Sequence, residues 1–467
     1  MSRTAIAGTG SLLVALGFAL LLEANGAPPE MARVAGLLVF TVGFWAFSVL
    51  PEAITALTFL LGAVVLTGMP SSTVFSGYTT AAFWLVFSGA ILGSCTARTG
   101  LTPWLAGRYL GPAVRGQRYT RQVAAVLGFA VALALVLPSV FGRVVILVPL
   151  VLALAESLGH PAKSRASNGL VLVACIGTFI VPISFLPANL PNIVIAGSLE
   201  TLYGITPGFT SYLLLHFPVL GVIKGIALVA IVSRLHAPRP GEVLPPAAEQ
   251  PAEGTLPDAN LPDAGRRMRI VLLITLALWM TDSLHGLPAA WIALGAALVC
   301  LLPVMKITSL QELPLQSIFP VVLFAGAVLS IGPVMTASGA GAALSGLMVD
   351  RLPLETASDF TALAMLAGLA VAMGLATTIP VAPAVTAPLF GDIAERVGWS
   401  IEAVGMSQVI GYATPLLPYQ LPPILVAAAM AGIPLREAAR ILLLTALVTT
   451  PLVLPAAWAW WQLLGWF

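Results

Sequence analysis

Two short polar segments that contain prolines interrupt long apolar stretches of this chain. The first is residues 186–193, Leu-Pro-Ala-Asn-Leu-Pro-Asn-Ile, and the second is residues 417–424, Leu-Pro-Tyr-Gln-Leu-Pro-Pro-Ile. Irregular backbone inside a bilayer leaves N–H and C=O groups unpaired at a cost of several kcal/mol each, so it persists only where it is buried in protein or lines a wet cavity. Two breaks in corresponding halves of a membrane protein are typical of a transporter's binding site.

The composition agrees with a membrane protein. Of the 467 residues, 59% are hydrophobic and only 9% are charged, and the mean hydropathy is +1.00. A soluble domain has about 25% charged residues. Apolar runs exceed the roughly 20 residues that span a bilayer as a helix and lack the alternation of an outer-membrane barrel. We predict an all-α polytopic membrane protein whose partner is the lipid bilayer, and the net charge of +2 gives no sign of a nucleic-acid partner.

Hydropathy predicts about eleven transmembrane helices and two further apolar stretches that are interrupted in the middle. The predicted spans are residues 5–25, 34–50, 52–69, 81–98, 166–199, 210–233, 269–284, 288–304, 317–347, 400–432 and 438–464. The interrupted stretches, 120–157 and 361–391, are predicted to be re-entrant hairpins. The spans 166–199 and 400–432 contain the proline breaks, so we expect them to be broken helices.

The two parts of the chain resemble each other in the order of their features. Pro51-Glu52-Ala53-Ile54 matches Pro288-Ala289-Ala290-Trp291, and Phe87-Ser88-Gly89 matches Phe324-Ala325-Gly326 with the same offset of 237 residues. An odd number of spans separates matching elements, which predicts an inverted repeat. The predicted organisation is an N-terminal helix region, a first repeat, a disordered cytoplasmic linker rich in proline, and a second repeat. These are residues 1–33, 34–234, 235–268 and 269–467.

Basic residues gather in the connecting segments 98–121 and 160–165 and at both ends of the linker. The positive-inside rule assigns such segments to the cytoplasm. We therefore predict that the protein lies in the inner (plasma) membrane with its N-terminus in the cytoplasm and its C-terminus outside.

The two hairpin turns carry the first candidate site residues. In the first turn Pro138 and Gly142 break the helix, Ser139 offers a hydroxyl, and Arg143 places a permanent charge within the membrane. An intramembrane arginine usually faces a partner, a cavity or a substrate, and its planar fork suits carboxylate, sulfate or phosphate oxygens. In the second turn Thr378 is the candidate.

The proline breaks carry the remaining candidates. Asn189 and Asn192 flank Pro191 in the first break, and Gln420 occupies the position of Asn189 in the second. Amides there can pair with freed backbone groups or bind a ligand. Lys224 and His216 lie in another predicted span, where either could pair with an acid or couple to protons. We predict a substrate site lined by Ser139, Arg143, Asn189, Asn192, Thr378 and Gln420.

The sequence gives no sign of catalytic or cofactor chemistry. No group of His, Cys, Asp and Glu has metal-ligand spacing, and no glycine-rich loop precedes a Lys-Ser or Lys-Thr pair. We expect no cofactor and no enzymatic activity. Sodium and proton coupling both stay open.

These residues resemble the divalent anion/sodium symporter family of the ion transporter superfamily. Asn189-Leu190-Pro191-Asn192 is similar to the family's Thr-Pro-Pro-Asn signature, and residues 138–143 resemble the Pro-Ser-Asn-Thr-Ala-Arg form of its dicarboxylate-exchanger branch. Val140 and Phe141 stand where that form has Asn and Thr. The resemblance implies a homodimer in which a transport domain moves against a scaffold.

The predicted function is secondary active transport of small anions, di- or tricarboxylate or sulfate-like, by alternating access. Two alternatives within transport are a cation/proton antiporter or metalloid-efflux permease of the same superfamily, and a membrane subunit of a multi-component carrier. A membrane-embedded enzyme is a third. Neither break contains the Asp or Glu that an antiporter would require.

Overall fold

The computed structural model of this protein describes residues 3–47, 49–137, 139–239 and 261–467, and these residues form helices joined by turns, with no strand among them. This confirms the predicted all-α fold. Within these residues eight helices are long and apolar enough to cross a membrane, and four shorter apolar helices accompany them. The predicted number of eleven spans is therefore not confirmed.

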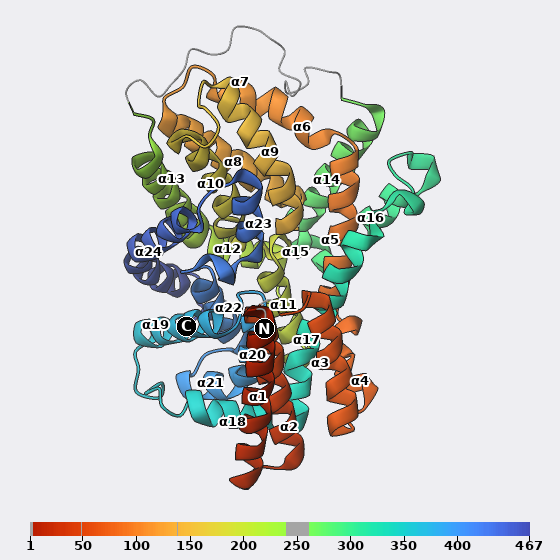
Figure 1. The fold of residues 1–467 in the computed structure, drawn as a ribbon, viewed down its shortest axis with the longest axis vertical. Coiled ribbons are helices and arrows are strands. Elements are labelled where there is room, and N and C mark those ends of the chain that lie inside the picture. The colour runs from red at the N-terminus through yellow and green to blue at the C-terminus, as the bar shows by residue number, and fades with distance from the viewer. Residues whose placement is uncertain (1–2, 48, 138, 240–260) are drawn as a thin grey trace.

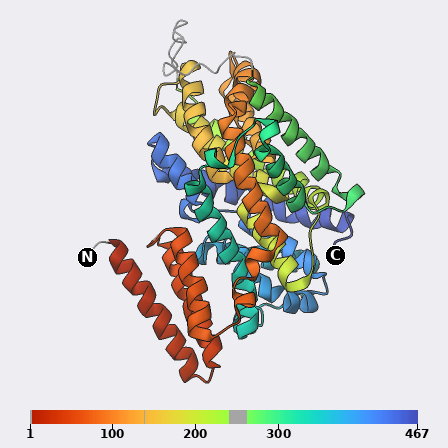
Figure 2. The same cartoon turned by 90° about the vertical axis from the view of Figure 1, so that its right-hand side faces the viewer.

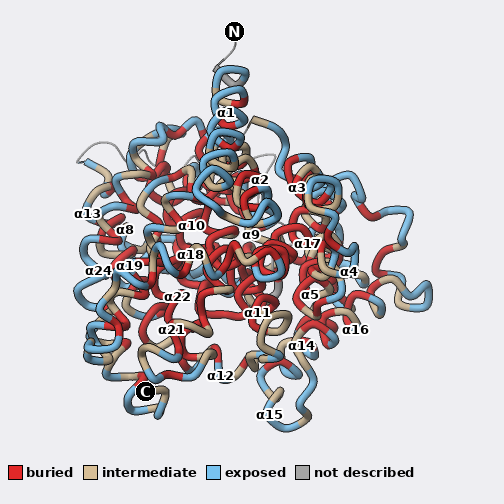
Figure 3. The backbone as a smooth tube through the Cα atoms, turned by 90° about the horizontal axis from the view of Figure 1, so that it is seen from below, coloured by how far each residue is buried: buried red, intermediate tan, exposed pale blue. Residues whose placement is uncertain are grey.

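Helices α1 (Arg3–Ala24) and α2 (Pro29–Ala46) form an antiparallel pair that projects from the rest of the molecule (Figures 1 and 2). α1 packs mainly against α2. Its outward leucines, among them Leu13 and Leu21, are exposed, which suits contact with lipid acyl chains. Figure 3 shows much of α1 in pale blue, in contrast to the buried centre of the molecule.

The elements that follow α2 fall into the two predicted repeats, on either side of residues 240–260. The first set is α3 (Glu52–Thr67), α4 (Ser71–Val74), η1 (Ser76–Thr79), α5 (Ala81–Arg98), α6 (Leu101–Leu105), η2 (Ala106–Leu110), α7 (Gly111–Val114), α8 (Tyr119–Val136), α9 (Val140–Ser157), α10 (Arg165–Ile180), η3 (Pro182–Ser184), η4 (Leu186–Ala188), α11 (Leu190–Tyr203), α12 (Phe209–His216), η5 (Phe217–Gly221) and α13 (Val222–His236). The second set is α14 (Asp263–Met280), α15 (Asp282–His285), α16 (Ala289–Leu301), η6 (Pro303–Met305), η7 (Leu310–Glu312), α17 (Leu315–Ser338), α18 (Ala340–Met348), α19 (Asp359–Ala376), α20 (Ala382–Thr386), η8 (Ala387–Leu389), α21 (Phe390–Val397), α22 (Ile401–Tyr412), η9 (Pro418–Gln420), α23 (Pro422–Ala431) and α24 (Leu435–Leu463).

The two sets interleave rather than forming separate bodies. α3 packs against α17, and α5 packs against α16. Likewise α9 of the first hairpin packs against α23, and α20 of the second hairpin packs against α11. The hairpin of α8 and α9 lies in the upper part of Figure 1, and α20 and α21 lie in the lower part. This placement is what an inverted repeat requires, while the orientation of each half in the membrane stays a prediction.

The two predicted hairpins differ in regularity. In the first, the long helix α8 ends at Val136 and the long helix α9 begins at Val140. In the second, only α19 is long, and the returning arm is divided into α20, η8 and α21. Pro383 and Pro388 are the second residues of α20 and η8, positions that tolerate a proline because the N–H there has no partner within the helix.

The predicted linker is shorter at its ends than the sequence suggested. α13 continues to His236 and α14 begins at Asp263, so residues 235–236 and 263–268 of the predicted linker are helical. The predicted disorder of residues 240–260 lies outside the described residues. The predicted span 317–347 also divides, because Gly339 has a φ of 78° and separates α17 from α18.

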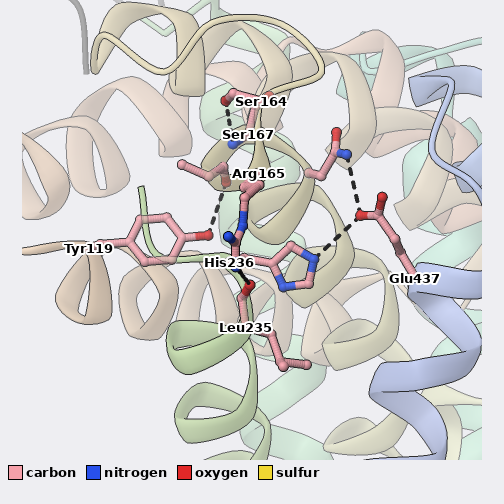
Figure 4. A network of polar contacts seen from close by, with 9 residues as sticks. Tyr119, Ser164, Arg165, Ser167, Leu235, His236 and Glu437 are labelled. Atoms are coloured by element: carbon pink, nitrogen blue, oxygen red, sulfur yellow. Dashed lines mark hydrogen bonds and ion pairs between the residues drawn. The ribbon is translucent and has the colours of Figure 1, made fainter. Parts of the chain in front are cut away.

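A polar network joins the two halves near the linker (Figure 4). Glu437 of α24 accepts a hydrogen bond from Asn168 of α10 and lies 3.4 Å from Nε2 of His236. Arg165 donates to the carbonyl oxygen of Leu235 at 2.6 Å. These contacts attach the C-terminal end of α13 and the N-terminal end of α24 to the start of α10.

Candidate functional site

The first break runs from the end of α10 to the start of α11, and its backbone groups are largely satisfied by side chains. The carbonyl oxygen of Phe179 accepts a hydrogen bond from Nδ2 of Asn189 at 3.0 Å. Nδ2 of Asn192 donates to the carbonyl oxygens of Ile183 and Phe185 at 2.9 and 2.8 Å. The last carbonyls of a helix have no partner within it, so Asn189 supplies a donor for Phe179 in the last turn of α10. Asn192 supplies donors for two carbonyls of the irregular segment that follows.

Arg143 lies at the centre of this arrangement and is fully buried, with 0% of its surface exposed. Its Nε donates to Oγ1 of Thr178, and its Nη2 donates to the carbonyl oxygen of the same residue at 2.7 Å and to Oδ1 of Asn189 at 2.9 Å. Its Nη1 donates to the carbonyl oxygens of Ala188 and Leu137. A guanidinium has five N–H donors, and the protein accepts from all of them.

The position of Arg143 differs from the expectation that its fork binds substrate directly. Because every N–H is occupied by protein, the side chain in this conformation acts as a clamp between the first hairpin and the first break. Its charge is not matched by a carboxylate, since no Asp or Glu among the described residues lies within ion-pair distance of it. The site therefore has a fixed, buried positive charge.

Ser139 is the N-cap of α9, and its Oγ accepts a hydrogen bond from the backbone N–H of Gly142 at 3.1 Å. The neighbouring Pro138, part of the predicted turn, lies outside the described residues. Asn192 has a second feature that the sequence did not reveal. Its Oδ1 is buried and accepts no hydrogen bond from the described residues. This oxygen is available to a donor that binds in the break.

The second break runs from α22 to α23 and is satisfied differently. Oε1 of Gln420 accepts hydrogen bonds from the backbone N–H groups of Leu416 and Leu417, at 2.7 and 2.8 Å. The end of α22 is closed by Lys224 of α13, whose Nζ donates to the carbonyl oxygen of Ala413 at 2.6 Å and to Oγ1 of Thr414 at 2.8 Å. Lys224 is 1% exposed.

The tip of the second hairpin is tied to the second break by backbone contacts. The N–H of Ile379 donates to the carbonyl oxygen of Gln420 at 3.3 Å. The hydroxyl of Tyr419 donates to the carbonyl oxygen of Leu375 at 2.6 Å. Thr378 lies between these contacts and is 8% exposed, and its hydroxyl makes no hydrogen bond with any residue that the structure describes.

The six predicted site residues thus form two clusters. Ser139, Arg143, Asn189 and Asn192 surround the first break, whereas Thr378 and Gln420 lie at the second. Each hairpin packs against the broken helix of the other half, which brings both clusters into the same central region. Within the described residues no hydrogen bond links one cluster to the other.

The sequence predicts that Lys224 pairs with an acid or couples to protons, and it does not predict a contact with the second break. Its actual partner lies 189 positions away in the second break, so no local pattern could have identified it. Thr178, which holds Arg143 with both its hydroxyl and its carbonyl, was also missed. Its only sequence signal is its place two residues before the end of α10.

An apolar cavity of about 630 Å³ lies beside the second hairpin. It is lined by α1, α2, α17 and α18, and by Leu375, Ala376 and Tyr419 near the hairpin tip. None of the six predicted residues lines it, so we do not assign the substrate to it.

The fold and the two breaks define a class of protein: a polytopic helical membrane protein with paired hairpins and paired broken helices, as in secondary transporters. Residues 6–467 match the family described as the sodium:sulfate symporter transmembrane region, so the chain belongs to this family. This confirms the resemblance found in the sequence, and the protein is a membrane transporter.

Individual relatives are more distant. A membrane protein of Cupriavidus necator is 22% identical over 399 residues, which cover 84% of this chain and 76% of the relative. The structure of the YdaH transporter of Alcanivorax borkumensis matches 94% of this chain and 99% of its own, with 17% identity and a TM-score of 0.57. The likeness to YdaH is a likeness of fold.

Proposed function

We propose that this protein carries small anions, of the dicarboxylate, tricarboxylate or sulfate type, across the inner membrane by alternating access. The observation that carries the proposal is the pair of buried cations at the two breaks. Arg143 and Lys224 have exposures of 0% and 1%, and no carboxylate among the described residues lies within ion-pair distance of either.

Unbalanced positive charge in a low-dielectric region attracts an anion strongly. A protein that carried a cation would need the opposite arrangement, with a carboxylate in the core. The described residues of both breaks hold amides, hydroxyls and carbonyls instead. This distribution favours an anion over the cation of an antiporter.

The N-terminus of α11 adds to the attraction. Asn189, whose backbone is extended, precedes the first residue of α11. Pro191 is the second residue of this helix and has no N–H. The helix dipole places partial positive charge at this end, so negative substrate oxygens are favoured there. We place the substrate between this end, the cap at Ser139 and the hydroxyl of Thr378, with the amide of Gln420 on the far side.

Alternating access requires a part of the protein that moves. Each hairpin tip is tied to the broken helix of its own half, by Arg143 in the first half and by Ile379 and Tyr419 in the second. We propose that the hairpins and broken helices move as one body in a homodimer. We further propose that the N-terminus is cytoplasmic and the C-terminus external.

The test is uptake of radiolabelled succinate, malate and sulfate by the purified protein in liposomes. Each anion is offered with and without an inward sodium gradient, and with and without unlabelled anion inside. We expect at least one anion to be accumulated or exchanged, and Thr378→Val to raise its KM. Folded protein that moves none of the three anions under any condition would overturn the proposal.

A further inference from the structure

Both broken helices end, inside the protein, against a cation supplied by the chain itself. The carbonyl oxygen of Thr178 in the last turn of α10 accepts from Nη2 of Arg143, and the carbonyl oxygen of Ala413 at the end of α22 accepts from Nζ of Lys224. The two cations come from different elements, α9 and α13. Both helix ends therefore pair with a cation, but the two cations occupy unrelated positions in the fold.

These helix ends are the places where a transporter binds a coupling cation. Freed carbonyls and the negative end of the helix dipole coordinate Na⁺ in broken helices. Here the freed carbonyls are already occupied. At the first break Arg143 and Asn189 occupy the carbonyls of Thr178, Phe179 and Ala188.

At the second break a buried cation likewise pairs with the end of the helix, but it makes fewer hydrogen bonds. Lys224 uses two of the three donors of its ammonium group, on the carbonyl oxygen of Ala413 and on Oγ1 of Thr414. Thr414 Oγ1 in turn donates to the carbonyl oxygen of Ile410 at 3.0 Å. The carbonyls of Ile410 and Ala413 at this end are thus both engaged by protein.

We infer that Arg143 and Lys224 act as fixed substitutes for coupling cations, so that this member of a sodium symporter family works without sodium. The inference deepens the proposed function and rests on it, because it concerns the coupling of the same site. The two residues are positioning residues: they hold the breaks in shape and supply the charge that a bound cation would bring. A sodium ion would have to displace one of them.

The first arm of the experiment measures thermal unfolding of the purified full chain in detergent. Tryptophan fluorescence gives Tm in sodium chloride and in choline chloride at equal ionic strength. We expect the wild-type Tm to be the same in both salts. A rise of Tm with sodium concentration in the wild type would overturn the inference.

The second part of the experiment removes one of the two fixed cations, the ammonium group of Lys224. In Lys224→Ala the oxygens of Ala413 and Thr414 lose their donor, so Tm in choline falls, and sodium or methylammonium restores part of the loss in a concentration-dependent way. Lys224→Arg keeps a cation and should not respond. Lys163→Ala is the matched control, because Lys163 is an exposed lysine outside both breaks. An equal loss of Tm in Lys224→Ala in all three salts would also overturn the inference.

Neither arm uses a substrate, so the inference and the proposed function can fail separately. Uptake of an anion that depends strictly on an inward sodium gradient would refute the fixed-cation inference and leave anion transport intact. Conversely, absence of uptake of every anion tested would refute the function, while sodium-independent Tm would still support the fixed cations. If Lys224→Ala does not fold, the wild-type titration and Lys224→Arg still decide the question.

Discussion

Oδ1 of Asn189 accepts a hydrogen bond from Nη2 of Arg143 at 2.9 Å, while Nδ2 of the same amide donates to the carbonyl oxygen of Phe179 at 3.0 Å. One side chain therefore binds a cation with one end and a helix end with the other. A neutral amide can do both, because it has an acceptor oxygen and an N–H₂ donor. This pairing is the reason that the first hairpin, the end of α10 and the start of α11 form one unit.

The first prediction concerns the shape of the Arg143 cation. Arg143→Lys keeps the charge but has three donors instead of five, so at least two of the five acceptors become unpaired. A buried unpaired group costs about 1–3 kcal/mol, so we expect roughly 2–6 kcal/mol of destabilisation, seen as a large fall in Tm. Arg118→Lys, at an exposed position, is the control and should leave Tm unchanged. A wild-type Tm for Arg143→Lys would contradict the clamp.

The second prediction separates two adjacent threonines. Oγ1 of Thr377 donates to the carbonyl oxygen of Met373 at 2.7 Å, whereas the hydroxyl of Thr378 has no hydrogen-bond partner among the described residues. Thr377→Val should lower Tm and leave KM for the transported anion near the wild-type value. Thr378→Val should do the reverse, because it removes a group that only a ligand would use. Uptake kinetics and thermal unfolding, measured on the same preparations, test both; equal KM values for Thr378→Val and wild type would remove Thr378 from the site.

The third prediction concerns the crossing of η1 and α17. A Cβ added to Gly77 would lie 2.2 Å from the carbonyl oxygen of Gly326, and the N–H of Gly77 donates to Oγ of Ser330 at 3.2 Å. Gly77→Ala must therefore push two helical elements apart. We expect a sharp loss of folded protein on size-exclusion chromatography. Gly10→Ala meets no atom within 4 Å and should behave as wild type; equal yields of the two variants would contradict the close crossing.

The sequence predicted the elements of this fold better than their contacts. Proline breaks and long apolar runs are local signals, so both broken helices and both hairpin turns were found from them. The acceptors of Arg143 come from Leu137, Thr178 and residues 188–189, which only folding brings together. For the same reason a guanidinium expected to face substrate turned out to be enclosed by backbone, and Lys224 gained a role that its surroundings in the sequence do not indicate.

The last prediction concerns pH and a histidine outside the membrane-spanning helices. His160, in the turn between α9 and α10, is buried, and its Nε2 lies 2.9 Å from Oε1 of Gln122. Burial lowers the pKa of His160 from its usual 6.5, because the charged ring loses solvation. Nδ1 has no partner among the described residues, so protonation would add a second N–H with no acceptor.

The direction in which pH changes stability follows from the protonation of His160 in the folded and the unfolded chain. Above pH 6.5 His160 is neutral in both the folded and the unfolded chain. As the pH falls through that value, the unfolded chain binds a proton that the folded chain does not, so stability is lost until the lower folded-state pKa is reached. Each unit of pKa depression corresponds to about 1.4 kcal/mol. His160→Gln keeps a donor for Gln122 but cannot titrate. We therefore expect its Tm to fall less between pH 7 and pH 5 than that of the wild type, and parallel Tm curves for the two proteins would show that His160 does not contribute.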